Sequence, residues 1–172
     1  MARNFMCTKT DPVVETKAGK LRGFQLDGTY AFHGVKYADA KRFHQPTPVE
    51  PWEGIKNALA YGYVCPMLQQ DQPSNELMVP HRYWPLDENC QYLNIWTQHL
   101  DPNAKKPVLV WLHGGGFAAG SSIEHIAYEG ENMSKYGDVV VVSLNHRLNI
   151  LGYLDLSPFG EEYKNSGNAG HA

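Results

Sequence analysis

Residues 108–117 read Val-Leu-Val-Trp-Leu-His-Gly-Gly-Gly-Phe, so that five consecutive apolar residues lead directly into His113 and three glycines. A second apolar run follows at Val139–Leu144. Near-continuous apolar runs are typical of strands that are buried on both faces of a parallel sheet. Glu131–Tyr136 predicts a short helix between the runs, which fits a crossover between parallel neighbours. The pattern therefore predicts an α/β fold.

The three glycines indicate a site for a negatively charged oxygen. Successive residues without a Cβ can adopt backbone conformations that bring their N–H groups close to a ligand. Gly114–Ala119 also fits the dinucleotide pattern G-x-G-x-x-A, but that pattern needs an immediate helix, which Gly120 and the serines after it interrupt. Ser121 and Ser122 lack the strand-to-helix elbow of a nucleophile, so we expect them to form loop hydrogen bonds.

The first half of the chain predicts short strands and a long irregular segment. Val13–Thr16 and Leu21–Leu26 flank a turn with a glycine and predict a β-hairpin, which a third strand near Tyr30–Val35 can join. Pro46–Pro85 carries seven prolines and predicts an irregular loop. Alternating residues at Tyr92–Gln98 predict a further strand.

Composition narrows the class of protein. The chain has 172 residues, of which 42% are hydrophobic and 19% charged, as in an ordinary globular domain. The net charge of -3 argues against a nucleic-acid binder. The apolar runs are far shorter than the roughly 20 residues that cross a membrane, so we expect no membrane span. The start of the chain has no secretory signal, which leaves a cytoplasmic or a mature secreted protein open.

Seven segments together resemble the type-B carboxylesterase and cholinesterase family of α/β-hydrolases, in the family's order. Lys36 and Asn89 replace the usual residues within two of them. The segments are Phe32–Ala38 (F-x-G-I-P-Y-A), Arg42–Pro46 (R-F-x-x-P), Glu88–Trp96 (E-D-C-L-Y-L-N-I-W), His113–Phe117 (H-G-G-G-F), Asn145–Arg147 (N-Y-R), Leu151–Leu154 (L-G-F-L) and Gly167–Gly170 (G-N-x-G).

The resemblance implies the N-terminal part of an α/β-hydrolase fold, with a small antiparallel N-terminal sheet and the first strands of the central mixed sheet. Residues 1–172 would then be one segment of a single domain whose remainder lies outside this chain. Asn168 could cap a helix, but too few residues follow it to form one. Apolar strands without further cover would also leave a face and an edge of the sheet open. We therefore expect the fold to be incomplete as an independent domain.

The resemblance also implies a carboxylic ester hydrolase. Gly115 and Gly116 would donate two of the N–H groups of the oxyanion hole, and His113 would orient the turn. Phe117 would lie beside the acyl-binding wall and Trp84 at the pocket mouth, although Trp84 can equally be a packing residue. No G-x-S-x-G elbow occurs, so nucleophile, acid and base would lie outside this chain, and the isolated chain is expected to be inactive.

The remaining implied residues are structural. Arg42 and Glu88 would form a salt bridge, and Arg147 would pair with an acid that follows residue 170. Cys65 and Cys90 fall where the family closes a disulfide, while two buried free thiols are the alternative for a cytosolic chain. The three cysteines of the chain have no zinc-site spacing, and we expect neither a metal nor a cofactor.

The expected partners are the remainder of the hydrolase domain and a small-molecule ester, with no nucleic acid. An alternative function remains open, since the fold can also serve as an adhesion or interaction protein or as a non-catalytic fragment. The intact H-G-G-G-F motif favours the enzyme, because a fold that only binds has no need of three glycines at this turn.

Overall fold

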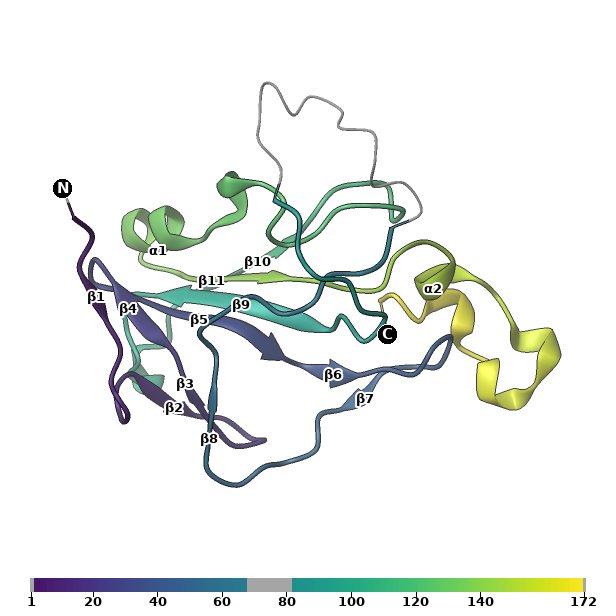
Figure 1. Cartoon of the computed structure of the whole chain (residues 1–172), viewed down its shortest axis with the longest axis horizontal. Coiled ribbons are helices and arrows are strands. Elements are labelled where there is room, and N and C mark those ends of the chain that lie inside the picture. Colours follow the sequence, from purple (N-terminus) through teal and green to yellow (C-terminus); the bar gives the residue numbers. More distant parts are fainter. Residues whose placement is uncertain (1, 68–81, 172) are drawn as a thin grey trace.

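A six-stranded mixed sheet organises the structure (Figure 1). The computed structural model describes residues 2–67 and 82–171. The order of the strands in this sheet is β1-β4-β5-β9-β11-β10. They span Phe5–Met6 (β1), Phe24–Leu26 (β4), Thr29–Lys36 (β5), Tyr92–Thr97 (β9), Val140–Leu144 (β11) and Val108–Leu112 (β10).

Two smaller sheets complete the described strands. The order β2-β3-β8 makes one of them, and β6-β7 makes the other. These strands span Val13–Glu15 (β2), Lys20–Arg22 (β3), Ala38–Asp39 (β6), Thr47–Pro48 (β7) and Ile55–Asn57 (β8). Short 3-10 helices span Pro102–Ala104, Ile126–Tyr128, Ser157–Phe159, Glu161–Tyr163 and Ser166–Asn168.

The parallel crossover predicted from the two apolar runs is confirmed. β10 and β11 are parallel, with Val110 opposite Val142. The helix α1 (Glu131–Gly137) lies between them in sequence and packs on β5, β9 and β11. Gly130 precedes this helix, and a Cβ there would lie only 2.6 Å from Val141. The close approach of the chain to the sheet thus requires a glycine at that point.

The predicted N-terminal hairpin is confirmed, but the predicted strand Leu21–Leu26 was wrong, because it is two strands in two sheets. β3 pairs with β2, whereas β4 pairs with β1 and β5. Gly23 separates them, and a Cβ there would lie 2.3 Å from the carbonyl oxygen of Ala31. β5, the predicted third strand, consequently joins the large sheet and not the hairpin.

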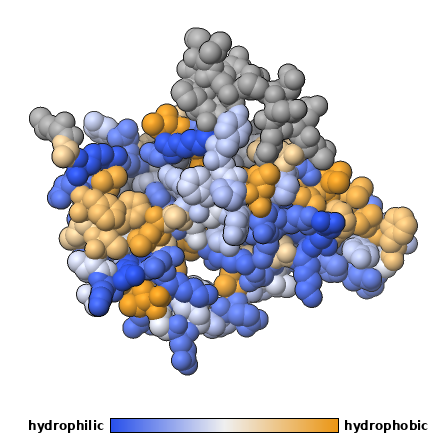
Figure 2. All heavy atoms as spheres, viewed as in Figure 1, coloured by the Kyte–Doolittle hydropathy of each residue, from blue (hydrophilic) through white to orange (hydrophobic). Residues whose placement is uncertain are grey.

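The second helix, α2 (Asn149–Tyr153), packs on the core with one face and leaves the other face exposed. Its residue Leu151 packs with Leu148, Cys65 and Cys90 in a buried cluster. On the other side, Ile150 is 50% exposed, and Figure 2 shows hydrophobic residues gathered over α2 and the segment that follows it. No helix in the described ranges is long and apolar enough to span a membrane.

The prediction that Val108–Leu112 is buried on both faces was wrong for this chain. All five residues of β10 are exposed, including Val108 at 60% and Leu112 at 56%. β10 is the edge strand and pairs only with β11, and the described helix α1 packs on β5, β9 and β11 and leaves the faces of β10 uncovered. The residues of β10 are as apolar as those of a central strand, but among the described residues β10 lies at the edge of the sheet.

We expect the isolated chain to self-associate and to bind the dye ANS, because an unpaired apolar edge strand is a template for pairing and presents open apolar surface. Val110→Lys, at a position that is 54% exposed, should reduce self-association in size-exclusion chromatography. Sharp, cooperative thermal unfolding of a monomer that binds no ANS would contradict this expectation.

Candidate functional site

The turn that follows β10 has an unusual backbone. Gly115, Gly116 and Phe117 have φ values of 122°, 62° and 60°. A Cβ at Gly115 would lie 2.0 Å from the carbonyl oxygen of Ala119, so only glycine fits there. At Gly116 the space is open, and the requirement for glycine is conformational. A strand thus ends in a sharp turn that no other residue type could form at Gly115.

The carbonyl groups of Gly115 and Phe117 accept hydrogen bonds, whereas the N–H groups of Gly115 and Gly116 donate none to the part of the chain that the structure describes. The Gly115 carbonyl accepts hydrogen bonds from the N–H groups of Ala118 and Ala119, at 3.1 and 3.2 Å. The Phe117 carbonyl accepts from the N–H of Asn149, at 2.7 Å. Within residues 2–67 and 82–171, no group accepts from the N–H of Gly115 or Gly116. Successive free N–H groups on such a turn can bind an anion.

His113 holds the start of the turn. Its buried ring donates from Nδ1 to the carbonyl oxygen of Gly114, at 2.8 Å, because a carbonyl can only accept. The ring also fills the space beside Gly120, where a Cβ would lie 2.7 Å from Nδ1. The Nε2 atom is buried and has no partner among the described residues. The role of His113 in orienting the glycine turn stays a prediction.

Phe117 and Trp84, the two predicted substrate-binding residues, have different surroundings. Phe117 is 59% exposed at the end of the turn and contacts the rings of Tyr153 and His171 at 5.4 and 5.2 Å. Trp84 packs on Tyr61 at 5.6 Å and donates from Nε1 to its carbonyl oxygen. The packing contacts of Trp84 are thus with Tyr61, and its place at a pocket mouth stays a prediction.

The predicted ion pair between Arg42 and Glu88 is confirmed. Arg42 donates from Nε to Oε2 of Glu88 at 2.7 Å, and a second bond joins the same groups. The Arg42 guanidinium lowers the pKa of Glu88. Because the arginine side chain is 63% exposed, the pair fixes local geometry and adds little stability.

Arg147 is fully buried, with 1% of its surface exposed. Its guanidinium donates to the carbonyl oxygens of Lys41, His44 and Ala169, at 2.9, 2.7 and 2.7 Å. Among the described residues no carboxylate pairs with it, and its Nε–H has no partner. Burial lowers its pKa. This arginine therefore links its own segment to two distant ones, at residues 41–44 and at Ala169, while its Nε–H remains unused among the described residues.

The disulfide implied for Cys65 and Cys90 is absent, because the structure holds both residues as buried free thiols. Both side chains belong to one buried cluster with Leu148 and Leu151. The neighbouring Cys65 thiol, together with burial, raises the pKa of Cys90. The Cys65 sulfur also accepts a hydrogen bond from the N–H of Leu148, at 3.1 Å. The pair thus packs as two small hydrophobic residues in the core beside α2.

A thiol titration checks this assignment. We expect Ellman's reagent to react with three thiols per chain after denaturation, because Cys7, Cys65 and Cys90 are all reduced. In the folded protein only the half-buried Cys7 should react readily, since the thiolate is the reactive form and burial disfavours it. A single reactive thiol after denaturation without reductant would instead establish the disulfide.

The serines after the turn are structural, as expected. Ser121 and Ser122 are 3% and 1% exposed, and their hydroxyl oxygens accept hydrogen bonds from the Ile123 N–H and the Asn94 side chain. The described part of the chain contains no group of three or more His, Cys, Asp or Glu side chains that could hold a metal ion. The glycine turn is therefore the chemically distinctive feature of this region.

Two residues beside the turn were missed from the sequence. His146 stacks on His113 and His171 stacks on His146, with ring centroids 5.0 and 5.2 Å apart. A signal was present for one of them, because His146 stands where the N-Y-R motif has tyrosine. No motif pointed to His171, which the fold brings to the turn from the far end of the segment that follows α2.

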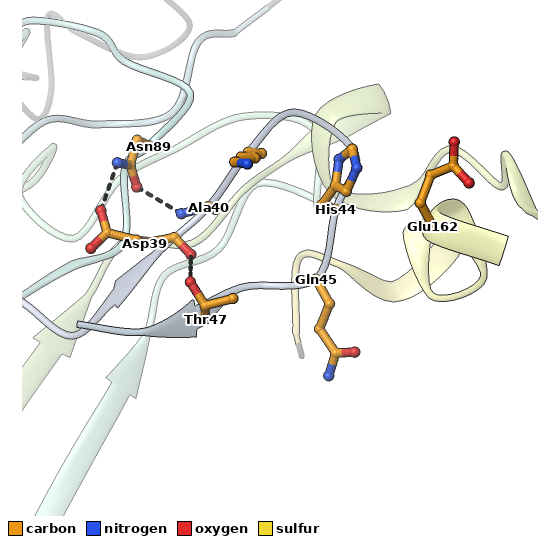
Figure 3. A pocket seen from close by; sticks show the side chains of 8 residues that line it. Asp39, Ala40, His44, Gln45, Thr47, Asn89 and Glu162 are labelled. Carbon is orange, nitrogen blue, oxygen red and sulfur yellow. Dashed lines mark hydrogen bonds between the residues drawn. The ribbon is translucent and has the colours of Figure 1, made fainter. Parts of the chain in front are cut away.

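A separate cavity of about 550 Å³ lies beside β6 and β7 (Figure 3). Several of the polar groups in its wall are hydrogen-bonded to one another. Asn89 donates to Asp39 at 3.0 Å and accepts from the N–H of Ala40 at 3.0 Å. None of the residues that line it belongs to the glycine turn. They are Asp39, Ala40, Lys41, His44, Gln45, Thr47, Asn89 and Glu162.

Known proteins that are similar to this chain are esterases and carboxylesterases. The model of the carboxylesterase family matches residues 10–172. A para-nitrobenzyl esterase of Bacillus subtilis is 37% identical over 91% of this chain and 32% of that protein. The structure of an esterase of Clostridium hathewayi, described as able to hydrolyse aliphatic aromatic polyesters, has a TM-score of 0.94 and 66% identity. The match covers 98% of this chain and 34% of that chain.

A carboxylesterase of Geobacillus stearothermophilus matches with a TM-score of 0.78 and 37% identity, over 92% of this chain and 31% of that chain. The chain thus spans about a third of the length of the relatives that it matches. The structure corresponds to part of an α/β-hydrolase domain.

Proposed function

This chain belongs to the carboxylesterase family, and on that premise we propose that it supplies the oxyanion-binding turn of a serine ester hydrolase. The observation that carries the proposal is the pair of N–H groups at Gly115 and Gly116, which have no acceptor among the described residues. They lie on an exposed turn in which the carbonyl groups of Gly114, Gly115 and Phe117 accept other hydrogen bonds. The turn is therefore preorganised to bind a negative oxygen.

The proposed reaction is acyl transfer from a carboxylic ester to water. A serine attacks the ester carbonyl, a histidine takes its proton and returns it to the leaving alcohol, and water then releases the acid. The carbonyl oxygen becomes negative in each tetrahedral intermediate, and the N–H groups of Gly115 and Gly116 donate to it. A third donor follows the nucleophile in this type of site. Phe117 lies beside the acyl group and Trp84 at the mouth of the pocket.

The nucleophile, the acid and the base lie outside residues 1–172 in this proposal. No G-x-S-x-G elbow occurs in the sequence, and the chain spans about a third of its relatives. Two features of the structure fit a missing remainder of the domain. The apolar strand β10 has one free edge, and the buried Arg147 keeps an unused donor at Nε. We propose that the remainder covers the strand and supplies the acid for Arg147.

A hybrid protein tests the proposal. In it, residues 1–172 replace the matched third of the Clostridium hathewayi esterase, to which they are 66% identical. We expect the hybrid to hydrolyse para-nitrophenyl butyrate and residues 1–172 alone to be inactive. A hybrid that folds without hydrolysing any ester would contradict the proposal and favour a non-catalytic role, and activity of residues 1–172 alone would place the nucleophile within this chain.

A further inference from the structure

Three imidazole rings form a column behind the glycine turn. His113 and His146 stack at 5.0 Å with 19° between their planes, and His146 and His171 stack at 5.2 Å with 26° between theirs. The column comes from three segments, since His113 follows β10, His146 follows β11, and His171 lies beyond α2. The middle ring therefore joins the turn to two other parts of the fold.

Both ends of the turn rest on this column. At the start of the turn, His113 donates to the Gly114 carbonyl. At its end, the Phe117 ring meets His171 edge-on at 5.2 Å. The Tyr153 ring contacts the rings of Phe117 and His171, and its hydroxyl lies 3.0 Å from Nδ1 of His171. Gly115 and Gly116 thus lie between two residues whose rings are fixed by the same stack.

The central ring of the column, His146, is held in its uncharged form. His146 is 6% exposed and donates from Nδ1 to the carbonyl oxygen of Arg147, at 3.0 Å. Burial lowers the pKa of His146 to about 4, although its hydrogen bond to the Arg147 carbonyl acts in the opposite direction. The ring is therefore neutral at pH 7 and can stack between two others without like-charge repulsion.

We propose that His146 and His171 are positioning residues for the oxyanion-binding turn. His146 fixes the ring of His113, and through it the Gly114 carbonyl, while His171 supports Phe117. Neither residue touches the reacting atoms in this account. They set the direction of the N–H groups of Gly115 and Gly116, and the inference therefore rests on the proposed function of that turn.

The experiment compares His146→Ala with His146→Phe in the hybrid, with rates expressed per active site titrated by a fluorophosphonate. His146→Ala leaves a gap between the outer rings, so we expect kcat to fall about tenfold or more with KM changed less than about twofold. His146→Phe keeps an aromatic ring in the column and should restore most of kcat. His171→Ala should lower kcat in the same way.

His99→Ala is the matched control. His99 is 48% exposed and pairs with Asp138 on the surface, away from the column, so its loss should leave kcat unchanged. A merely structural role for His146 would lower the number of titrated sites and leave kcat per site unaltered, which would overturn the inference. Equal kcat in His146→Ala and His146→Phe would overturn it as well. Failure of the wild-type hybrid to be titrated would instead refute the proposed function.

Discussion

Gly115→Ala is expected to lower kcat of the hybrid by about 100-fold to 1,000-fold, the effect of removing one oxyanion donor. The added Cβ would lie 2.0 Å from the carbonyl oxygen of Ala119, and the φ of 122° is unfavourable for alanine. The backbone must therefore move, and the N–H of Gly115 moves with it. Because this donor acts mainly in the transition state, kcat and kcat/KM should fall together.

Gly28→Ala serves as the control for this substitution. Gly28 also has a positive φ, of 86°, but a Cβ there meets nothing within 4 Å. Alanine at this position, which is far in sequence from the glycine turn, has the unfavourable positive φ, which costs about 1 kcal/mol, but makes no steric clash. Steady-state kinetics should show unchanged kcat for Gly28→Ala. A Gly115→Ala variant that keeps more than a third of kcat would show that the turn does not bind the oxyanion.

Arg147→Ala is expected to reduce the free energy of unfolding of the hybrid by about 3–5 kcal/mol. The substitution removes a fully buried guanidinium and takes the donor from three carbonyl oxygens, that of Ala169 in a buried bond and those of Lys41 and His44 in partly buried ones. Each buried group left unsatisfied costs about 1–3 kcal/mol. Arg147→Lys keeps the charge but loses the planar fork that reaches three acceptors, so it should recover only part of the loss. Urea denaturation followed by tryptophan fluorescence measures both variants.

Arg42→Gln is the matched control, because it also removes a guanidinium that forms hydrogen bonds, in this case at the surface. Arg42 is exposed and its pair with Glu88 faces solvent, so the urea midpoint should change little. If Arg147→Ala proved no more destabilising than Arg42→Gln, the three carbonyl contacts would not hold the segments together as described.

Local patterns in the sequence predicted several elements correctly. The apolar runs before His113 and Asn145, with a helix between them, gave a parallel pair of strands, because such runs and their spacing are local properties. The turn around Gly19 likewise gave the hairpin of β2 and β3. The family resemblance placed the Arg42–Glu88 pair correctly.

Properties that depend on distant parts of the chain were not predictable. The exposure of β10 follows from its position at the edge of the sheet and from the packing of α1 on other strands, neither of which its own residues encode. The division at Gly23 follows from the carbonyl of Ala31 in another strand. The stack of His113, His146 and His171 forms only when the fold brings three segments together. The one local indication of it is His146, which stands where the N-Y-R motif has tyrosine.

The most direct test of the central claim is fluorophosphonate labelling of the hybrid and of residues 1–172 alone, followed by intact mass spectrometry and peptide mapping. The account predicts one adduct per hybrid, on a serine outside residues 1–172, and no adduct on the isolated 172-residue chain. An adduct on a serine within residues 1–172, or ester hydrolysis by a hybrid that the probe neither labels nor inhibits, would contradict it.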